Sequence, residues 1–401
     1  MDLRTGITDG TPEDRCSERR SRVEKDLNLD LSALNPAPDS IGHADEKNCE
    51  QMLGHVPVPV GYAGPLTVTF SSGQKHDIHL PLATTEGALV ASVNRGCKAL
   101  SMSGGVTTSS VHHGISRSIA FRIQDAKIRT DARTTVGKAA KQWIPIAQTT
   151  SRHLKVLKYD IDAADDHLFI TLFCDTDEAM GMNMVTIAAQ AVGEWIEKNI
   201  DGLEFITVAG NVDSDKKPSQ RVHDKGRGYE VTAEAILTPD VIHDVLKTTP
   251  EALLAVAEAK LKHGSTIAGA LGSNLHAANI IAALYLATGQ DAAHVVEGSL
   301  TDTSVQLAPG ATKKRRNEET NLRIAIHSPA ILIGLRGGGT TLPAQSQCLK
   351  MLMQSKTSLH PKAQLAESIG AAVLAGEISL LAAQAGHTLA SAHGKLGRLT
   401  K

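Results

Sequence analysis

Lys216 and Glu86 are the charged residues whose surroundings most favour chemistry. The segment AGNVDSDKKPSQ (209–220) has a composition typical of a loop, and it places Lys216 directly after Asp215. A lysine ammonium that faces a cleft can stabilise a developing oxyanion, although such a charged run is also typical of a solvated turn. Glu86, in TTEG (84–87), falls in the expected first turn of a helix, where a carboxylate can interact with the helix dipole or act as a proton donor.

Three other residues allow both a structural and a catalytic interpretation. Asp291 follows a long uncharged stretch, as an acid at a helix end does, and Lys260 stands in the basic last turn of a helix before a glycine. His393, one of 17 histidines, lies near the end of a C-terminal helix. The glycine runs MGMN (180–183) and LRGGGT (335–340) permit close approach of a ligand, but neither is a dinucleotide or phosphate fingerprint. The residue types alone therefore indicate an α/β enzyme without naming its reaction.

The composition excludes several classes of protein. The 401 residues carry 41 basic and 43 acidic side chains, a formal net charge of −2, which gives no general attraction to nucleic acids or anionic membranes. The five cysteines never form a C-x-x-C pair, which argues against a disulfide framework and favours a reducing, cytoplasmic location. The N-terminus lacks an apolar signal region. The uncharged stretch 264–290 contains several polar residues, so we expect a buried helix there and no membrane span in this chain.

The hydrophobic patterns predict an α/β (α+β) fold in four parts. Residues 1–40 are charged and end in a proline-containing turn, which indicates an N-terminal arm or helix. Residues 41–117 begin a larger domain with strands and turns, then switch to a helical period at 84–100 with Thr84 or Thr85 as the N-cap. Residues 118–206 alternate strands and helices as a small inserted α+β domain, and residues 207–401 complete the larger domain with alanine-rich helices. The apolar stripe of the first helix is Leu89, Val90, Val93, Cys97 and Leu100.

Six segments that occur together and in order resemble one enzyme family. They are EQMLGHVPVPVGYAGPL (50–66), LATTEGALVASVNRGCKA (82–99), EAMGMNM (178–184), GNVDSDKKP (210–218), HAANIIAALYLATGQDAA (276–293) and GGGTTLPAQSQCL (337–349). Together they closely resemble the catalytic portion of 3-hydroxy-3-methylglutaryl-CoA (HMG-CoA) reductase, of the eukaryotic and archaeal class. The resemblance runs from about residue 41 to 398, so it leaves out residues 1–40 and the multi-span membrane anchor of many eukaryotic members.

The resemblance implies an activity and a fold. The family reduces a CoA thioester to the alcohol mevalonate by two hydride transfers from two NADPH, releases CoA and uses no metal. Its fold has a large domain around a long central helix, a small inserted NADP-binding domain that would correspond to 118–206, and active sites built between two subunits. We therefore expect HMG-CoA and CoA as ligands, NADPH as cofactor, and a homodimer or homotetramer.

Four residues would be catalytic by this resemblance. Glu86 would protonate the substrate oxygen, and Lys216 would stabilise the oxyanion. Asp291 would hydrogen-bond both of them and tune their protonation, because a neighbouring carboxylate in a closed site raises the pKa of a glutamic acid. His393 would protonate the departing CoA thiolate. The interval from His387 to His393 is one residue longer than the usual spacing, so His387 is an alternative for this role.

The resemblance also assigns residues to ligand binding. Basic side chains suit a carboxylated substrate and the phosphates of CoA. The carboxylate and hydroxyl of the substrate would meet Arg117, Asp215, Lys217, Lys260 and Asn279, and CoA would lie against Ser92, Asn94, Arg95 and Lys98. The 2′-phosphate of NADPH would be bound by Ser151 and Arg152, and the rest of the dinucleotide would contact Glu178, Met180, Gly181, Met182, Asn183 and Arg398.

Four positions depart from the family pattern. Ala209 stands where a serine usually precedes Gly-Asn, which removes a hydroxyl whose hydrogen bond is worth about 0.5–1.5 kcal/mol. Glu178 replaces the usual Asp of the DAMGMN motif and follows Asp177, while Gln51 replaces an Asn. Arg336 places a bulky cation in a turn that is normally apolar and tight. A reductase that makes mevalonate is the leading interpretation, and a reductase of another acyl-CoA or a non-catalytic CoA-ester binder is the alternative.

Overall fold

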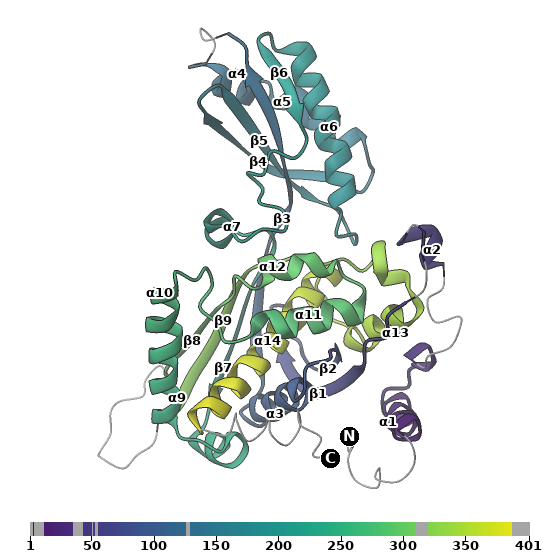
Figure 1. The fold of residues 1–401 in the computed structure, drawn as a ribbon, viewed down its shortest axis with the longest axis vertical. Helices are drawn as coiled ribbons and strands as arrows, with labels where there is room; N and C mark the ends of the chain where they lie inside the picture. The colour runs from purple at the N-terminus through teal and green to yellow at the C-terminus, as the bar shows by residue number, and fades with distance from the viewer. Residues whose placement is uncertain are drawn as a thin grey trace.

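The computed structural model describes residues 3, 12–34, 43–49, 51–52, 55–125, 129–308 and 320–386, which form two domains. Figure 1 shows them as two lobes joined through the long strand β3 and the segment around α7. The strands are β1 (Val60–Thr69), β2 (Lys75–Ala83), β3 (Val106–Ile123), β4 (Lys155–Ala164), β5 (His167–Asp175), β6 (Leu203–Thr207), β7 (Gly228–Leu237), β8 (Asp302–Leu307) and β9 (Leu322–Ile331).

Helices of three kinds surround these strands. The α-helices are α1 (Pro12–Leu27), α2 (Ala44–Lys47), α3 (Leu89–Met102), α4 (Ala132–Lys138), α5 (Ala140–Thr149), α6 (Met182–Asn199), α7 (Gln220–Lys225), α8 (Pro239–Val241), α9 (Pro250–Ala257), α10 (Ser265–Ala268), α11 (Ala277–Thr288), α12 (Val295–Gly298), α13 (Pro343–Leu352) and α14 (Pro361–Ala385). The 3-10 helices are η1 (Ser32–Leu34), η5 (Ala292–His294) and η6 (Gly338–Thr341), and the π-helices are η3 (Ile242–Leu246) and η4 (Glu258–Gly264).

Strand β3 belongs to both domains. From Thr107 to Gly114 it pairs with β7 of the larger domain, and from Ile115 to Arg122 it pairs with β5 of the smaller one. The larger sheet has the order β2-β1-β3-β7-β9-β8, with β1 and β3 parallel and the other neighbours antiparallel. Strands β4, β5 and β6 complete the smaller sheet. This mixed sheet with its helices confirms the expected α/β class.

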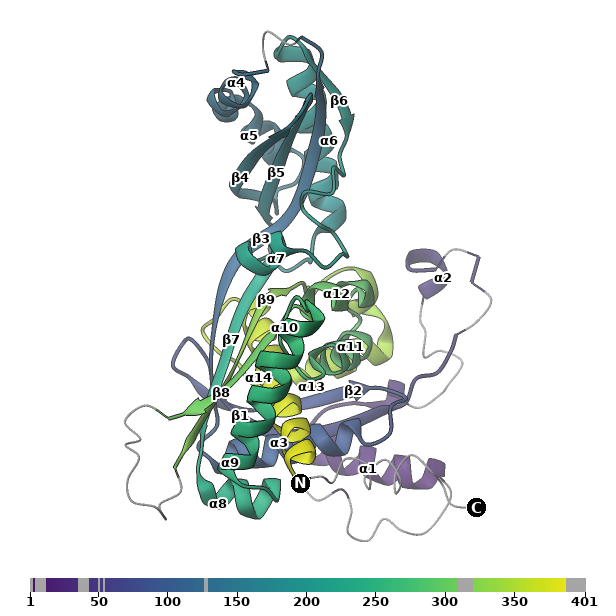
Figure 2. The same cartoon turned by 60° about the vertical axis from the view of Figure 1, so that its left-hand side comes forward.

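The smaller domain has its own hydrophobic core. Helices α5 and α6 pack against each other and on the sheet, as Figure 2 shows from the side. Trp143 of α5 is fully buried in this core, and its indole Nε1 donates a hydrogen bond of 3.1 Å to the Val136 carbonyl. The β-rich and helical patterns between residues 118 and 206 therefore correspond to observed strands and helices.

Helix α14 is the centre of the larger domain. It packs on α3, α9, α11 and on strands β3, β7 and β9, and nearly all of its residues are buried. Two of them are fully buried carboxylates, each held by hydrogen bonds. Glu367 accepts from the Ser71 amide and from the hydroxyls of Ser71, Thr108 and Ser110. Glu377 accepts from the amides of Leu275 and His276 and from the Thr303 hydroxyl.

The apolar helices differ from one expectation. The stretch 264–290 is not one buried helix, because positive φ angles at Gly269 (64°) and Gly272 (86°) separate α10 from α11. Among the described helices, α14 is the one long and apolar enough to cross a membrane, and 94% of its apolar window is buried inside the protein. Such burial is typical of a core helix, so α14 provides no sign of a membrane span.

The first helix of the larger domain also begins later than expected. Helix α3 starts at Leu89, and its N-cap is Ala88 in a left-handed conformation with φ 73°, so neither Thr84 nor Thr85 caps it. The apolar stripe itself is confirmed, since all its members except the half-buried Val90 are buried. The N-terminal arm contains α1, whose Val23 and Leu27 pack with Leu31 and Met351 in a small cluster on the larger domain.

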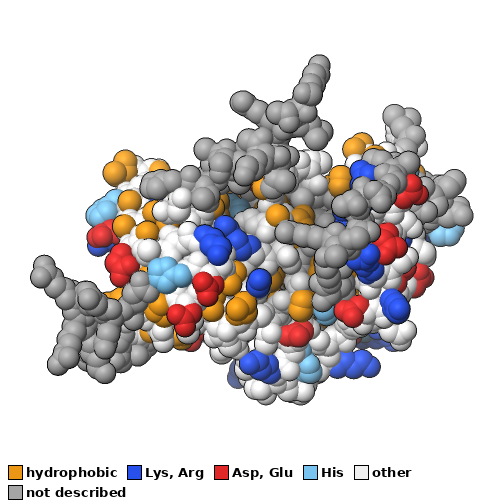
Figure 3. Space-filling view, turned by 90° about the horizontal axis from the view of Figure 1, so that it is seen from below, with side chains coloured by type: hydrophobic (Ala, Val, Ile, Leu, Met, Phe, Trp, Pro, Cys, Tyr) orange, Lys and Arg blue, Asp and Glu red, His pale blue; other side chains and the backbone are white. Residues whose placement is uncertain are grey.

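The surface of the larger domain carries charges of both signs. Figure 3, seen from below, shows Lys and Arg side chains intermixed with Asp and Glu across the described part of that face. This distribution agrees with the near-neutral sequence and gives no continuous basic surface on that face for a polyanion.

The close contact of α3 with α14 leads to a stability prediction. A Cβ atom on Gly96 would lie 1.9 Å from the carbonyl oxygen of Ala375, so Gly96→Ala must push the two helices apart. We expect a loss in unfolding free energy of at least about 3 kcal/mol, the upper end for an overpacked core. In Gly137→Ala, the control in α4, the nearest atom lies at 3.7 Å, so stability should stay equal or rise by up to about 1 kcal/mol. Urea unfolding of the two variants measures both, and equal stabilities would contradict the prediction.

Candidate active site

Lys216 is held at both of its ends. Its ammonium Nζ lies 2.8 Å from Asp291 Oδ2, and its backbone amide donates a hydrogen bond of 2.7 Å to Glu297 Oε1. The loop between β6 and α7 that carries it is strained, because Asn211, Ser214 and Lys216 all have positive φ angles of 64°, 55° and 58°. Backbone strain of this kind persists only where the surroundings hold it in place, and it is concentrated at functional sites.

A buried arginine contacts this loop from the interior of the protein. Arg227, with 1% of its side chain exposed, donates to Glu297 Oε1 at 2.7 Å and to Asp215 Oδ1 at 3.0 Å. Its Nε donates to the Ser116 hydroxyl of β3 at 2.9 Å, and Nη2 lies 3.3 Å from the Met182 sulfur of α6. The guanidinium therefore connects the loop, both domains and α12.

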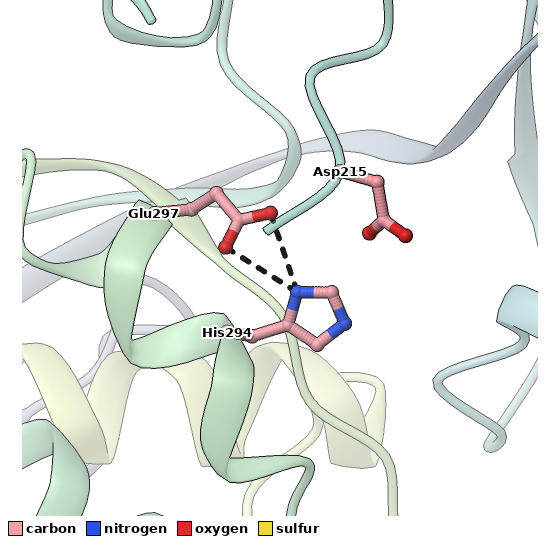
Figure 4. A group of neighbouring side chains, drawn as sticks. All are labelled: Asp215, His294 and Glu297. Atoms are coloured by element: carbon pink, nitrogen blue, oxygen red, sulfur yellow. Dashed lines mark hydrogen bonds and ion pairs between the residues drawn. The ribbon is translucent and has the colours of Figure 1, made fainter. Parts of the chain in front are cut away.

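Asp215, His294 and Glu297 form a group with the composition of a metal site. Their donor atoms lie within 4.8 Å of one another, and Figure 4 shows the His294 ring beside the Glu297 carboxylate with Asp215 facing them from the loop. The positive charge of this group is already supplied by Arg227, whose guanidinium bonds both carboxylates. We therefore interpret the group as an ion network built from side chains.

The carboxylates around Lys216 and Arg227 have different pKa values. Burial acts to raise the pKa of Asp291, but its hydrogen bonds with Lys216 and the Ala293 amide and the nearby His294 outweigh burial, so the net shift of the pKa is downward. Burial likewise acts on Asp215, where Arg227 outweighs it and lowers the pKa. In Asp213, burial dominates and raises the pKa despite Arg227 and Arg117. Asp291 and Asp215 are therefore anionic at neutral pH. Asp291 pairs with Lys216, and Asp215 pairs with Arg227.

Glu86 and Asn279 form a second pair. Glu86 lies in the turn before α3, three residues ahead of its first residue, and its Oε2 accepts a hydrogen bond of 2.8 Å from Asn279 Nδ2. Asp291 is not among the described partners of Glu86, so one of the two contacts expected of Asp291 is absent from this structure. Asn279 lies in the first turn of α11, whereas Asp291 follows the C-terminal end of that helix, which at 12 residues is about 18 Å long.

The expected substrate residues are distributed over several elements. Arg117 of β3 lies 3.4 Å from Asp215 Oδ2 and 3.7 Å from Asp213 Oδ2, and Lys217 Nζ donates to the Asp215 carbonyl at 3.0 Å. Arg117 and Lys217 therefore both contact Asp215, the residue before Lys216. Lys260, by contrast, lies in η4, where its ammonium donates to Gln384 Oε1 at 3.4 Å near the end of α14.

The residues expected to meet CoA lie along α3 and mostly have partners within the chain. The Arg95 guanidinium donates to the Ser379 hydroxyl at 3.0 Å and to its carbonyl at 2.5 Å, and Ser92 Oγ donates to the same hydroxyl. Asn94 Oδ1 accepts from the Gly64 amide at 2.9 Å. Lys98 is exposed to solvent. On this helix, Lys98 is thus the cation most accessible to an anionic ligand.

The tight loop between β5 and α6 and the first turn of α6 together contain most of the expected dinucleotide residues. Gly181 is the N-cap of α6 with φ 93°, and a Cβ on it would lie 2.4 Å from Thr176, so a larger residue does not fit. Lys362, at the start of α14, donates to Thr176 Oγ1 at 3.3 Å and to the Ala179 carbonyl at 3.1 Å. The amides at the start of a helix suit an anion such as a phosphate, and the buried lysine fixes the loop that presents them.

Ser151 and Arg152 lie beside this loop. The Ser151 hydroxyl accepts from the His153 amide at 3.2 Å, and Arg152 is exposed with its Nε 3.0 Å from His153 Nε2. His153 Nδ1 in turn lies 3.0 Å from Asp177 Oδ2, a contact that lowers the pKa of Asp177. The sequence-distant segments 151–153 and 177–183 are therefore adjacent.

Two departures from the family pattern turn out to be partners. Glu178 and Arg336 form an ion pair, and the Leu335 amide donates to the Glu178 carbonyl at 2.8 Å. The Arg336 side chain is 79% exposed, so it does not crowd the glycine turn as its size suggested. A cation opposite a longer carboxylate explains how both unusual residues are accommodated.

Several functional candidates were missed by sequence reasoning, and several fall outside the structure. Arg227, His294, Glu297 and Lys362 make the contacts described above, yet only the spacing of His294 and Glu297, three residues apart just after Asp291, gave a local signal. His393, His387, Arg398 and Glu50 lie outside the described residues.

Comparison with known proteins shows which proteins this chain is similar to. A family model described as hydroxymethylglutaryl-coenzyme A reductase matches residues 15–398, so the match includes most of α1 and begins earlier than residue 41. The chain is 37% identical to the 3-hydroxy-3-methylglutaryl-coenzyme A reductase of Methanocaldococcus jannaschii over 385 residues, 95% of this chain and 92% of the relative. It is also 37% identical to reductase 1 of Dictyostelium discoideum, over 93% of this chain and 67% of that protein.

A solved structure has the same fold. It is a class II 3-hydroxy-3-methylglutaryl-CoA reductase from Streptococcus pneumoniae bound to NADPH, with a TM-score of 0.71 at 18% identity, covering 92% of this chain and 86% of that one.

The buried pair Arg227–Glu297 yields a prediction for the site. Glu297→Ala removes the acceptor of two buried groups, and an unpaired buried charge typically costs about 3–5 kcal/mol of unfolding free energy. The control is Glu258→Ala, whose carboxylate is 65% exposed beside Lys262 and should cost less than about 1 kcal/mol. Chemical denaturation of both variants gives the comparison. Equal small losses would show that the buried pair does not stabilise the site.

Proposed function

The chain belongs to the hydroxymethylglutaryl-coenzyme A reductase family of oxidoreductases, and from that membership we propose its activity in detail. It converts HMG-CoA, two NADPH and two protons into mevalonate, CoA and two NADP⁺. The observation that carries this proposal is the ammonium of Lys216, which is fixed by Asp291 next to Arg117 and Asp215. A fixed cation beside groups that bind a carboxylate suits a reaction that passes through an oxyanion.

The two reductions need stabilisation of negative charge on the same oxygen. NADPH, when bound, supplies the hydride for each of them. In the first reduction the thioester carbonyl oxygen becomes an oxyanion, and Lys216 Nζ donates a hydrogen bond to it. The C–S bond then breaks, the carbonyl re-forms as an aldehyde, and the CoA sulfur leaves as a thiolate. His393, or His387 in its place, would protonate that thiolate.

The second reduction ends with proton transfer to the alkoxide. We assign Glu86 as the acid that protonates this oxygen, and its hydrogen bond with Asn279 would orient it. Asp291 would hold the Lys216 side chain in place through their ion pair of 2.8 Å. Because the Glu86–Asn279 and Lys216–Asp291 pairs lie at different ends of α11, we propose that the complete active site is built between two subunits of a homodimer or homotetramer.

NADPH and the acyl-CoA would occupy neighbouring sites on the chain. The dinucleotide would lie along Met180, Gly181, Met182 and Asn183 at the start of α6, with Glu178 and Arg398 at its edges and its 2′-phosphate at Ser151 and Arg152. The geometry that supports this is the contact chain from His153 to Asp177, which places the two segments together. The substrate carboxylate would meet Arg117, Lys217 and Lys260, and CoA would run along α3 to Lys98. We propose a cytoplasmic location for this reaction.

The lysine in the loop gives the first functional prediction. Lys216→Ala should lower kcat for HMG-CoA-dependent NADPH oxidation by about 10²–10³-fold, because one oxyanion donor is lost. Lys350→Ala, an exposed lysine on α13, is the control and should retain wild-type turnover. The wild type should consume two NADPH per CoA released. Wild-type turnover in Lys216→Ala would exclude Lys216 as the oxyanion donor. A wild-type protein that is folded but shows no turnover would favour the alternative of a non-catalytic CoA-ester binder.

The arginine beside the dinucleotide loop gives a prediction on cofactor choice. Arg152→Gln should raise KM for NADPH about 10- to 100-fold and leave KM for NADH within about twofold, since a hydrogen bond to a charged group contributes about 1.5–3 kcal/mol. The matched control is Arg122→Gln, which removes an exposed arginine of the same domain that pairs with Glu204. Steady-state kinetics with both dinucleotides measure the ratio. An equal change for NADH and NADPH would rule out a 2′-phosphate contact.

A further inference from the structure

His294 lies fully buried between two carboxylates. Its Nδ1 is 3.3 Å from Glu297 Oε1 (Figure 4). Its Nε2 is 3.6 Å from Asp291 Oδ2. Within the described part of the chain, Nε2 has no hydrogen-bond partner at normal distance although it is shielded from solvent. A buried polar atom without a partner is costly, so its place beside a carboxylate calls for a physical reason.

The two carboxylates that flank His294 are the ones that hold Lys216. Asp291 binds the ammonium and Glu297 binds the backbone amide, so one imidazole adjoins both attachments of this lysine. Residue 216 keeps a left-handed conformation with φ 58°, and its side-chain direction depends on both contacts. A shift of either carboxylate would therefore move Lys216 Nζ.

Charged groups surround the ring. Asp291 and Glu297 face it from η5 and α12, and Asp215 faces it from the loop. The nearby cations are Lys216 and Arg227. The ring therefore lies between two carboxylates that hold the same lysine, with Nδ1 on the Glu297 side and Nε2 on the Asp291 side.

We propose that His294 is a positioning residue for Lys216, and that its buried ring keeps Asp291 and Glu297 in the places from which they hold this lysine. The inference rests on the proposed function in that Lys216 is taken as the oxyanion donor. Without the ring, Asp291 is held by Lys216 and the Ala293 amide alone. Turnover then falls because the ammonium is misplaced, while substrate affinity changes little.

The variant His294→Gln tests this directly. Glutamine keeps a donor and an acceptor but lacks the ring that lies between the two carboxylates. We expect kcat for NADPH oxidation to fall about 10- to 100-fold, the effect of misplacing a catalytic group by about an ångström. KM for HMG-CoA and NADPH should stay within twofold. His167→Gln, a half-buried histidine of the smaller domain paired with Asp166, is the control and should keep the wild-type kcat.

A second measurement separates this inference from the proposed activity. Acetic anhydride labels free amines, and peptide mass spectrometry gives the labelling rate of Lys216 without any turnover. The rate should rise at least threefold in His294→Gln, because a loosened Asp291 no longer shields the amine. His294→Leu should show a larger rise if it folds, and His294→Gln stays decisive if it does not.

The outcomes are distinct. An inactive wild type with faster Lys216 labelling in His294→Gln would contradict the proposed activity and support the positioning role. Wild-type kcat and labelling rate in His294→Gln would overturn the positioning role whatever the activity.

Discussion

The buried guanidinium of Arg227 is the interaction on which the site depends. It contacts Ser116 of β3, Met182 of α6, Asp215 of the loop and Glu297 of α12, and these segments come from both domains. A charge buried this deeply is tolerated only with complete pairing, so the guanidinium fixes where each of its partners lies. The strained loop with Lys216 is one of those partners, and its position therefore follows from the assembly of the two domains rather than from its own sequence.

Helix α14 plays the equivalent part in the larger domain. Its carboxylates Glu367 and Glu377 receive hydrogen bonds from the turn after β1, from β3 and from the segment before α11. Because Glu377 binds the amides of Leu275 and His276, it determines where α11 begins and hence where Asn279 can meet Glu86. Polar groups in an otherwise apolar helix thus orient the surrounding elements, while alanine and glycine let them approach closely.

The local pattern of apolar and polar residues was sufficient to predict which segments are helices or strands. It was not sufficient to predict where these elements end or which residues they contact. The apolar stripe of α3 predicted a real helix, but its start moved to Leu89 because a left-handed Ala88 and a turn at Glu86 precede it. The uncharged stretch 264–290 was wrongly predicted as one helix, since composition does not reveal the positive φ angles at two of its glycines. The pairs Arg227–Glu297 and Glu178–Arg336 join residues 70 and 158 positions apart. The periodic pattern of apolar residues along a sequence gives no information about such distant ion pairs. The motif residues themselves were identifiable only through resemblance.

The order of elements along the chain has a consequence for biosynthesis. The smaller domain is nearly contiguous, so its strands and helices have all left the ribosome once β6 has been made. The larger domain contains α14 at its centre, and this helix spans Pro361–Ala385, later in the sequence than the elements it packs on. Until those residues emerge, β1, β3, α3 and α11 lack the surface they pack on, and their apolar faces remain open to chaperones. The nascent polypeptide thus carries a completed smaller domain on an unfinished larger one until α14 has been made.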